Sequence, residues 1–423
     1  MARIPDTARM NIPFRPMLSA MSRHKATAFL LAAQIALTLA IVANAVFVID
    51  QRVLLMLRPT GIDESNTVIV ENRWVDELSP AQVQAKTAAD LAMLRELPAV
   101  TDAYSDYSFP GAGPVAEVWG ISLVPGQSKP LSYAEPYYAD EHALHTYGLR
   151  LITGRNFEAS EILLDAETSK ASSGPVLITQ DLAVKLFGAE SALGKVVYVG
   201  DVAKTVVGIT VNLQVPAVGT HSFAYRSILS PVRYSDPTGS QYVIHTKPGQ
   251  QQSVKSTVAA ALFEVSASRI IDESAGVQNF DSLRSRAYAR DRGLIILLCI
   301  TCVILLLATG GGIVGVTVLW VSERHREIGL RRALGATRLE IAAHILTENF
   351  FIVSAGIAVG AALAFAANIA LMHFLEMSSL PAVFIALGSF LVLLLGQCSA
   401  LLPARHASRI EPMEAMRLAS RST

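Results

Sequence analysis

Four long runs without a charged side chain constrain this chain more than any other feature of its sequence. None of them contains Asp, Glu, Lys or Arg, and they occupy residues 26–49, 293–321, 350–374 and 381–402. An α-helix needs about 20 apolar residues to cross the ~30 Å hydrocarbon core of a bilayer. The composition agrees, because 17% of the residues are charged whereas soluble domains average about 25%. We therefore predict four transmembrane helices.

Basic residues flank these runs unevenly. Lys and Arg occur before the first run, between the second and third, and after the fourth, whereas the connection between the third and fourth carries Glu376 and no basic residue. Under the positive-inside rule, the two ends of the chain, 1–25 and 403–423, and the loop 322–349 are predicted to be cytoplasmic. The long insert 50–292 is then predicted to lie on the opposite side of the membrane.

The insert is long enough to bury a hydrophobic core of its own. Its apolar pattern switches repeatedly between the periods of strands and helices. Strands are predicted at 66–71, 176–180, 206–211 and 241–246, and helices at 80–97, 181–187 and 253–263. We therefore predict an α+β domain between the first and second membrane helices. The charged segment 281–292 is predicted to be a stalk helix that continues directly into the second membrane helix.

The first apolar run has a second interpretation. Basic residues precede it, and Ala43-Asn-Ala45 resembles the small-residue cleavage site of a secretory signal. The apolar stretch continues to Ile49, which makes it longer than the apolar part of such signals. An uncleaved membrane anchor is therefore the favoured interpretation.

Several motifs resemble ligand sites but lack an essential part. Gly310 to Gly315 matches G-x-G-x-x-G, yet it lies inside an apolar run instead of at a strand–helix junction in water. Glu141 to His145 lacks the order H-E-x-x-H that places zinc ligands beside a general base. We predict no cofactor, no metal, no nucleotide site and no nucleic-acid partner. An anchored extracytoplasmic enzyme is disfavoured because no catalytic arrangement is visible and one span would tether it, so the chain is predicted not to be an enzyme.

Glycines four residues apart occur in two of the apolar runs. Gly311 and Gly315 lie in the second run, and Gly356 and Gly360 lie in the third. Small residues at this spacing let the backbones of two membrane helices approach closely. All four are therefore predicted to be helix-packing positions.

The loop before the third run, SERHREIGLRRALGATRLEI, concentrates charge between two uncharged stretches. Glu327 and Arg331 have the i,i+4 order that stabilises a helix, and Gly335 suits a helix end. Thr337 and Glu340 fit a capping box at the start of another helix. We predict a short helix, a tight break and a second helix. From composition alone, the arginines could either set topology and meet anionic headgroups or form a docking surface.

Three parts of the chain resemble the FtsX-like, MacB-type permeases of ABC transporters. They are Arg326-Glu-Ile-Gly-Leu-Arg-Arg-Ala-Leu-Gly-Ala336, the closing stretch 402–417, and the segments 147–157 and 178–195 of the insert. The resemblance extends over nearly the whole chain and is weakest before residue 26 and at 211–250. In this family, the loop after the second span docks into an ATPase that is separate or fused, and the periplasmic domain moves when two ATPases close.

The resemblance implies a permease subunit of the bacterial inner membrane with a MacB-like periplasmic core domain. The implied partners are a separate ATPase subunit on the cytoplasmic side, a second permease protomer that is identical or different, a periplasmic adaptor, and membrane lipids. Export or extraction of a hydrophobic or peptide-like substrate is implied. The alternative is a mechanotransmitting regulator of a cell-wall hydrolase or sensor, without transport. Carried over from the motif, the candidate coupling residues are Arg326, Glu327, Gly329, Arg331, Arg332, Gly335 and Ala336.

Overall fold

The structure is a computed structural model that describes residues 25–111, 117–164, 166–220, 222–375 and 379–409. It contains two compact units. We call Met1–Leu54 with Arg292–Thr423 the helical unit, and Leu55–Asp291 the two-sheet unit. The basic residues before 25 and after 409, and Glu376, lie outside the described residues.

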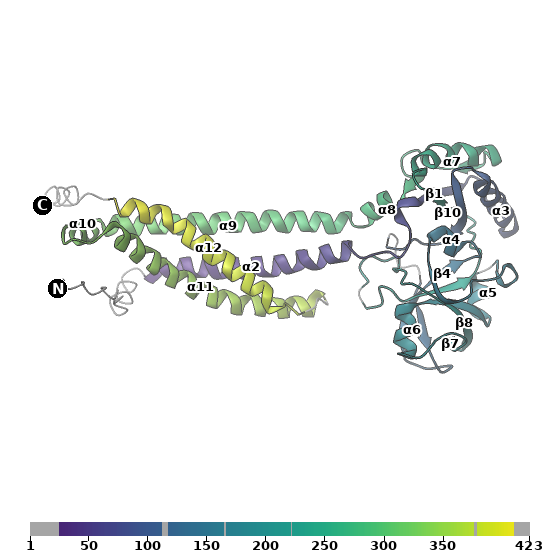
Figure 1. Ribbon diagram of the computed structural model, residues 1–423, viewed down its shortest axis with the longest axis horizontal. Helices are drawn as coiled ribbons and strands as arrows, with labels where there is room; N and C mark the ends of the chain where they lie inside the picture. The colour runs from purple at the N-terminus through teal and green to yellow at the C-terminus, as the bar shows by residue number, and fades with distance from the viewer. Residues whose placement is uncertain (1–24, 112–116, 165, 221, 376–378, 410–423) are drawn as a thin grey trace, which may run out of the picture. The chain divides into compact units, whose positions relative to one another are not determined.

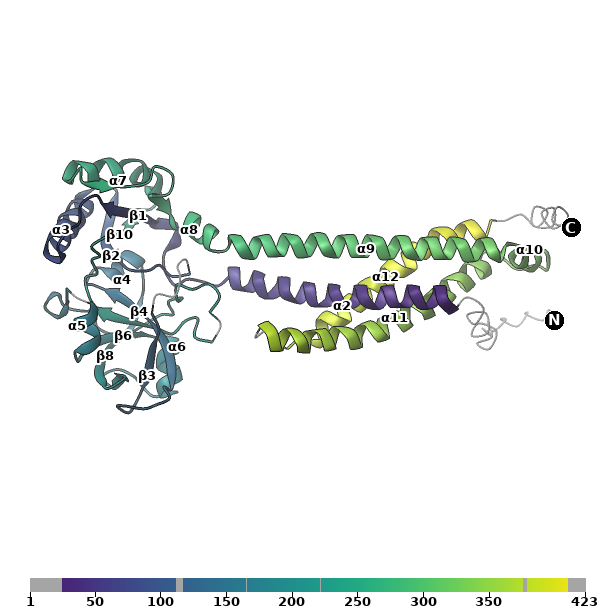
Figure 2. The ribbon, with the colours of Figure 1, turned by 180° about the vertical axis from the view of Figure 1, so that it is seen from behind.

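Within its described residues, the helical unit contains four helices that are long and apolar enough to cross a membrane. They are α2 (Lys25–Met56), α9 (Ala289–Glu323), α11 (Arg338–Leu375) and α12 (Ala382–Ala407). Both views show α12 running beside α11 (Figures 1 and 2). The helices extend beyond the uncharged runs because polar residues can continue a helix outside the hydrocarbon layer. The prediction of four transmembrane helices with an insert between the first two is confirmed.

Polar side chains join the helices of this unit. Thr38 of α2 hydrogen-bonds to Thr309 of α9 (Oγ1 to Oγ1, 2.8 Å), and Asn44 Nδ2 donates to the carbonyl of Ala364 in α11 (3.0 Å). Between α11 and α12, Asn349 Nδ2 donates to the Gly396 carbonyl (2.9 Å). Such bonds between membrane helices are worth roughly 1 kcal/mol each, and they add to an apolar core that includes side chains from all four helices.

Gly356 and Gly360 of α11 lie directly against α2. A Cβ atom at Gly356 would lie 2.8 Å from Ile35 Cγ2, and one at Gly360 would lie 2.8 Å from the carbonyl oxygen of Ala36. These distances are shorter than any ordinary carbon contact. The two helices can therefore approach this closely only because both positions lack a side chain.

The glycines of α9 that face other helices are not the predicted pair. A Cβ atom at Gly312 would lie 2.9 Å from Gln34 Oε1 of α2, and Gly310 faces α12. By contrast, a Cβ atom at Gly311 or Gly315 would have none of the described neighbouring atoms within 4 Å. Within this chain, the glycines of α9 that contact other helices are therefore Gly310 and Gly312, which flank the predicted Gly311. The packing role of Gly311 and Gly315 stays a prediction.

The first sheet of the two-sheet unit is antiparallel, with strand order β11-β1-β10-β2 and β12 paired to β1. Its strands are β1 (Thr67–Trp74), β2 (Val100–Asp106), β10 (Gly239–Thr246), β11 (Arg269–Ile270) and β12 (Val277–Asn279). Two helices, α3 (Pro80–Glu96) and α7 (Gln251–Val265), pack on one face through apolar residues such as Leu91 and Val258. Figure 1 shows both helices beside β1 and β10.

The second sheet is mixed, with strand order β5-β8-β6-β9-β4-β3-β7. Its strands are β3 (Trp119–Ser122), β4 (Ser132–Ala139), β5 (Leu151–Gly154), β6 (Gly174–Thr179), β7 (Val196–Val199), β8 (Val202–Thr210) and β9 (Ser227–Pro231). The pairs β4–β9 and β6–β8 are parallel. Helix α6 (Gln180–Phe187) follows β6 and buries Leu182 and Leu186, which confirms the strand–helix sequence predicted there. A shorter helix, α5 (Ala166–Ala171), precedes β6.

The two sheets share one hydrophobic core. Ile69, Tyr104 and Val243 enter it from the first sheet, and Leu177 and Leu229 enter it from the second. The short helix α4 (Ala143–Tyr147) follows β4 of the second sheet but packs against β2 and β10 of the first. The predicted α+β class is therefore confirmed, and α4 links the two sheets.

The predicted stalk helix is interrupted. Helix α8 (Phe280–Ala287) ends at Tyr288, whose φ of −93° and ψ of 8° depart from helical values, and α9 begins at Ala289. Tyr288 is buried, and its hydroxyl donates to the Leu55 carbonyl (3.2 Å) and accepts from Gln214 Nε2 (3.3 Å). The segment 281–292 is therefore helical as predicted except at Tyr288, where one residue separates α8 from α9.

Candidate coupling site

The charged loop after α9 folds as a short helix followed by a tight turn. Helix α10 (His325–Ala333) ends where the amide of Ala336 donates to the Arg331 carbonyl (3.0 Å). Gly335 has a φ of +103°, which glycine adopts without steric cost and other residues rarely do. The predicted helix, break and second helix are confirmed.

The first turn of α11 carries the predicted capping box. The Thr337 amide donates to Glu340 Oε2 (2.9 Å), and the Glu340 amide donates to Thr337 Oγ1 (3.3 Å). Together these bonds satisfy two amides that a helix start leaves without partners. A side-chain cap of this kind stabilises a helix by ~1 kcal/mol. The corner between α10 and α11 is therefore held from both sides, by a glycine turn and by a cap.

One side of α10 packs against the helical unit. Ile328 is buried against Ile341 of α11 and Ala407 of α12. Gly329 is buried beside it, and Ala336 is half-buried. Among the predicted coupling residues, these two therefore face the helices of this chain, where they fix how closely α10 lies.

The other side of α10 is exposed. Arg326 and Arg331 are exposed, and Arg331 Nη2 donates to Glu327 Oε1 (2.6 Å) across one turn. The prediction of this i,i+4 pair is confirmed. Beside them, Leu330 is 62% and Leu334 is 81% exposed. Apolar side chains that are exposed together mark interaction sites, and the leucines were not among the predicted coupling residues, although their spacing on an amphipathic helix was the available signal.

The remaining predicted residues are divided between these surfaces. Glu327 and Gly335 are exposed, and Arg332 is half-buried. Behind the helix, Arg324 forms an ion pair with Glu348 of α11. No local sequence pattern indicates this pair, because its partners are 24 residues apart and belong to different helices.

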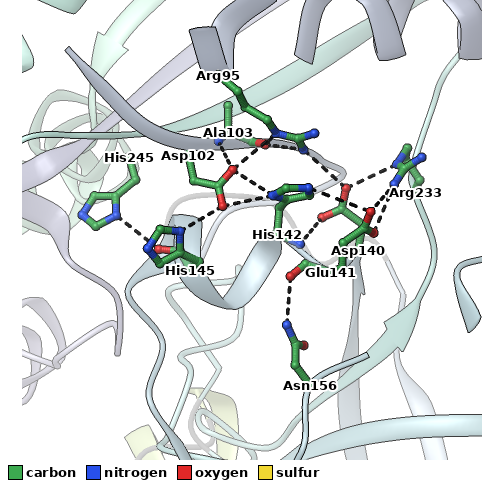
Figure 3. A network of polar contacts seen from close by, with 10 residues as sticks. All are labelled: Arg95, Asp102, Ala103, Asp140, Glu141, His142, His145, Asn156, Arg233 and His245. Atoms are coloured by element: carbon green, nitrogen blue, oxygen red, sulfur yellow. Dashed lines mark hydrogen bonds and ion pairs between the residues drawn. The ribbon is translucent and has the colours of Figure 1, made fainter. Parts of the chain in front are cut away.

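A polar network in the two-sheet unit surrounds the two histidines of the rejected metal motif (Figure 3). The Nδ1 atoms of His142 and His145 lie 3.1 and 3.0 Å from Asp102 Oδ2 of β2. Arg95 Nε lies 3.3 Å from Asp102 Oδ1. Burial raises the pKa of Asp102, but the hydrogen bonds from His145 and His142 outweigh it and hold the pKa below its ordinary value of 3.8. The described residues contain no group of three or more His, Cys, Asp or Glu able to hold a metal ion, so we interpret this network as the polar link between α4 and β2.

Two further acidic residues extend the network toward the second sheet. Arg233 Nη2 lies 2.8 Å from Glu141 Oε1, and Arg233 Nε lies 3.4 Å from Asp140 Oδ2 (Figure 3). Asn156 Nδ2 donates to the Glu141 carbonyl (2.9 Å). The turn before α4 is therefore tied to the segments that follow β9 and β5.

Two family models match the chain. The model described as "MacB-like periplasmic core domain" matches residues 31–261, which is more than half of the chain, and the model described as "FtsX-like permease C-terminal" matches residues 299–412. The chain belongs to the MacB/FtsX-like permease family. The second match contains α10, the Gly335 turn and every predicted coupling residue.

Curated relatives of this MacB/FtsX-like permease carry export names. It is 28% identical over 280 residues to the macrolide export ATP-binding/permease protein MacB of Chromobacterium violaceum, covering 64% of this chain and 41% of that protein. It is 26% identical over 429 residues to the macrolide export ATP-binding/permease protein MacB 1/2 of Paracoccus denitrificans, covering 98% and 60%. The chain thus spans between about two fifths and three fifths of the length of these relatives.

Among solved structures, the periplasmic region of MacB from Actinobacillus actinomycetemcomitans matches with a TM-score of 0.34 and 14% identity, over 55% of this chain and 96% of that chain. Four apolar helices combined with a MacB-like periplasmic core domain make this permease a multi-pass inner-membrane protein with a periplasmic domain. The predicted localisation is confirmed.

Proposed function

We propose that this chain is the permease subunit of an ABC transporter, and that a separate ATPase subunit binds α10 and the Gly335 turn from the cytoplasm. Closure of two ATPases on ATP brings together the α10 helices of two permease protomers. Helix α9 relays this movement toward the periplasmic domain. The result is export or extraction of a hydrophobic or peptide-like substrate from the outer face of the membrane.

The exposed side of α10 is the observation that carries this proposal. Arg326 and Arg331 offer planar guanidinium groups that can make bidentate contacts with carboxylates on a partner. Leu330 and Leu334 add apolar area that a partner would remove from water, worth roughly 25 cal/mol per Å². The names of the curated relatives, which join ATP binding with a permease, agree with a partner of this kind.

The polar side chains of the membrane helices support handling of the substrate at the outer face. Thr38, Asn44 and Asn349 make hydrogen bonds between helices. Polar groups committed in this way stabilise the helix bundle and do not line a water-filled path. A substrate that enters from the periplasmic side needs no such path through the helices.

Reversing the charge of the adjacent arginines Arg331, which is exposed, and Arg332, which is half-buried, tests the proposal. In Arg331→Glu with Arg332→Glu, we expect co-purification of the ATPase from native membranes and its ATP turnover to fall at least tenfold, because each charge-assisted contact is worth ~1.5–3 kcal/mol. The matched control is Arg405→Glu with Arg409→Glu, which makes the same charge change at exposed positions at the end of α12. Both variants should reach the membrane in normal amounts. Unchanged co-purification and turnover in the α10 variant would overturn the coupling assignment.

A further inference from the structure

The joint between α9 and α10 is anchored to a different helix. Arg324 is the residue at this joint, with a φ of −98° and a ψ of 11°. Its Nη1 atom lies 2.8 Å from both carboxylate oxygens of Glu348 in α11. The end of the second membrane helix is thereby fixed to the cytoplasmic part of the third.

The low solvent exposure of this ion pair restricts the arrangement of its two side chains. The Glu348 side chain is only 9% exposed and that of Arg324 is 26% exposed. A buried carboxylate is costly unless it is paired and hydrogen-bonded, and removing one partner of a buried pair leaves an uncompensated charge. His344 Nε2 lies 3.6 Å from Glu348 Oε1, one turn away on α11. The low exposure therefore favours one arrangement of Arg324 over the many that a surface arginine could adopt.

A cavity lies beside the pair, between α9, α10 and α11. Its volume is about 200 Å³, and Trp320, Ile328 and Ile345 contribute much of its apolar lining. Side chains that line a void lose the dispersion contacts that close packing would provide. Ile328 and Ile341, which pack together with Ala407, also border this void, so apolar packing holds α10 only in part and the ion pair carries more of the task of fixing its direction.

We propose that Arg324 and Glu348 are positioning residues that set the direction in which α10 leaves α9. With the pair intact, a displacement of α10 moves α9 and α11 together. Without it, α10 turns at the joint into the neighbouring cavity, and the displacement is absorbed there. The effect on coupling rests on the proposed function, whereas the orientation of α10 is a property of the permease alone.

The geometry predicts which step is lost when the pair is broken. Leu330 and Leu334 are exposed on α10 itself, whereas Arg324 lies before the first residue of α10 and pairs with Glu348 of α11. A partner would therefore still find its contacts on α10. Relay of movement is expected to suffer, and binding of the ATPase is not.

Distances between spin labels on the permease alone test the positioning role. In a background with the native cysteines replaced, labels are placed at Ala333→Cys on α10 and Ala358→Cys on α11, both exposed positions separated by roughly 30 Å of helix. Arg324→Gln and Glu348→Gln should broaden the distance distribution at least twofold. The charge-swapped double variant, Arg324→Glu with Glu348→Arg, should narrow it again. Arg405→Gln, which removes an exposed arginine from the same end of the unit, should leave it unchanged.

ATP turnover of the assembled complex tests the consequence. Arg324→Gln should lower the maximal rate at least fivefold while the amount of co-purified ATPase stays within twofold of the wild-type amount, and the charge swap should recover at least half of the rate. If a single variant fails to accumulate, the double neutral variant Arg324→Gln with Glu348→Gln is used, because it removes the uncompensated charge and still lacks the ion pair. The label distances in this variant then test whether the pair sets the direction of α10.

The outcomes separate this inference from the proposed function. A wild-type distance distribution in Arg324→Gln, or in the double neutral variant, would overturn the positioning role. A broadened distribution in a permease to which no ATPase binds would support the positioning role and contradict the proposed function. Failure of the charge swap to narrow the distribution would show that the two side chains act separately and would also overturn the inference.

Discussion

Asp106 shows at the scale of one residue how burial sets a charge in the periplasmic domain. Its carboxylate accepts hydrogen bonds from the hydroxyls of Tyr104 (2.7 Å) and Tyr147 and from the amide of Tyr107 (2.7 Å). Burial raises the pKa of Asp106 from 3.8 to about 6, and these hydrogen bonds lower it only in part. The carboxyl group lies beside the core that the two sheets share, so its protonation affects the stability of that core.

The raised pKa predicts a pH dependence of stability. The folded protein binds the Asp106 proton more tightly than the unfolded chain does. The stability that this proton contributes to the folded state is therefore fully present below pH 3.8 and is lost as the pH rises through about 6. The two values differ by an amount worth ~3 kcal/mol. The measurement is the free energy of unfolding in urea between pH 4 and pH 8. In Asp106→Asn, we expect the decrease in this free energy with rising pH that is due to Asp106 to disappear.

Asp272→Asn is the control for this experiment. Hydrogen bonds from Ser274 and the Ala275 amide lower the pKa of Asp272, so this carboxyl group is already ionised over the pH range measured. The slope above pH 4 should then match that of the wild-type protein. Equal slopes in the wild-type protein and Asp106→Asn would contradict the role assigned to Asp106.

At the scale of helices and strands, the features that could be predicted depend on residues close together in the sequence. The Thr337–Glu340 cap, the Gly335 turn and the step from β6 to α6 each follow from a few neighbouring residues. The membrane helices follow from the absence of charge over a long run. Local chemistry and hydrophobic period are sufficient for features of this kind.

Features that join distant segments could not be predicted in this way. The ion pair of Arg324 with Glu348 and the contacts of Asp102 with the histidines of α4 depend on how separate elements pack. The break at Tyr288 has the same origin, because it follows from bonds to Leu55 and Gln214. The site was therefore predictable as a segment of charged residues, while the division into an exposed side, a packed side and an anchored joint required the structure.

Helix packing in the membrane gives a prediction at this scale. A side chain at Gly360 would collide with backbone atoms of Ala36, whereas Gly315 has open space. Because overpacking costs ~1–3 kcal/mol, we expect Gly360→Leu to lower the melting temperature in detergent by several degrees. Gly315→Leu should leave the melting temperature of the single protomer unchanged.

The same pair of variants examines the predicted role of Gly315. Light scattering of the purified protein would show whether Gly315→Leu shifts the protein toward single protomers, as expected if this glycine packs against a second copy. An equal loss of thermal stability in both variants would contradict the arrangement of α2, α9 and α11 described above.

At the scale of the whole molecule, the direction of the chain through the membrane can be tested directly. We predict that the α10 segment is cytoplasmic and that the β3–β4 connection is periplasmic. In a background without native cysteines, a membrane-impermeant thiol reagent should label Ser128→Cys, an exposed position, in cells whose outer membrane has been permeabilised. Ala333→Cys should react only after the inner membrane is opened. Labelling of Ala333→Cys from outside would refute both the topology and the proposed function.

The two segments that connect the periplasmic domain to the membrane helices are tied to each other at their base. Arg284 of α8 contacts the carbonyl oxygens of Met56 (2.8 Å) and Arg58 (2.5 Å), and the Tyr288 hydroxyl donates to the Leu55 carbonyl. A force that arrives along either segment therefore acts on the same small set of hydrogen bonds. The two connections to the membrane helices therefore act as one mechanical element, because neither can move away from the other without breaking these hydrogen bonds.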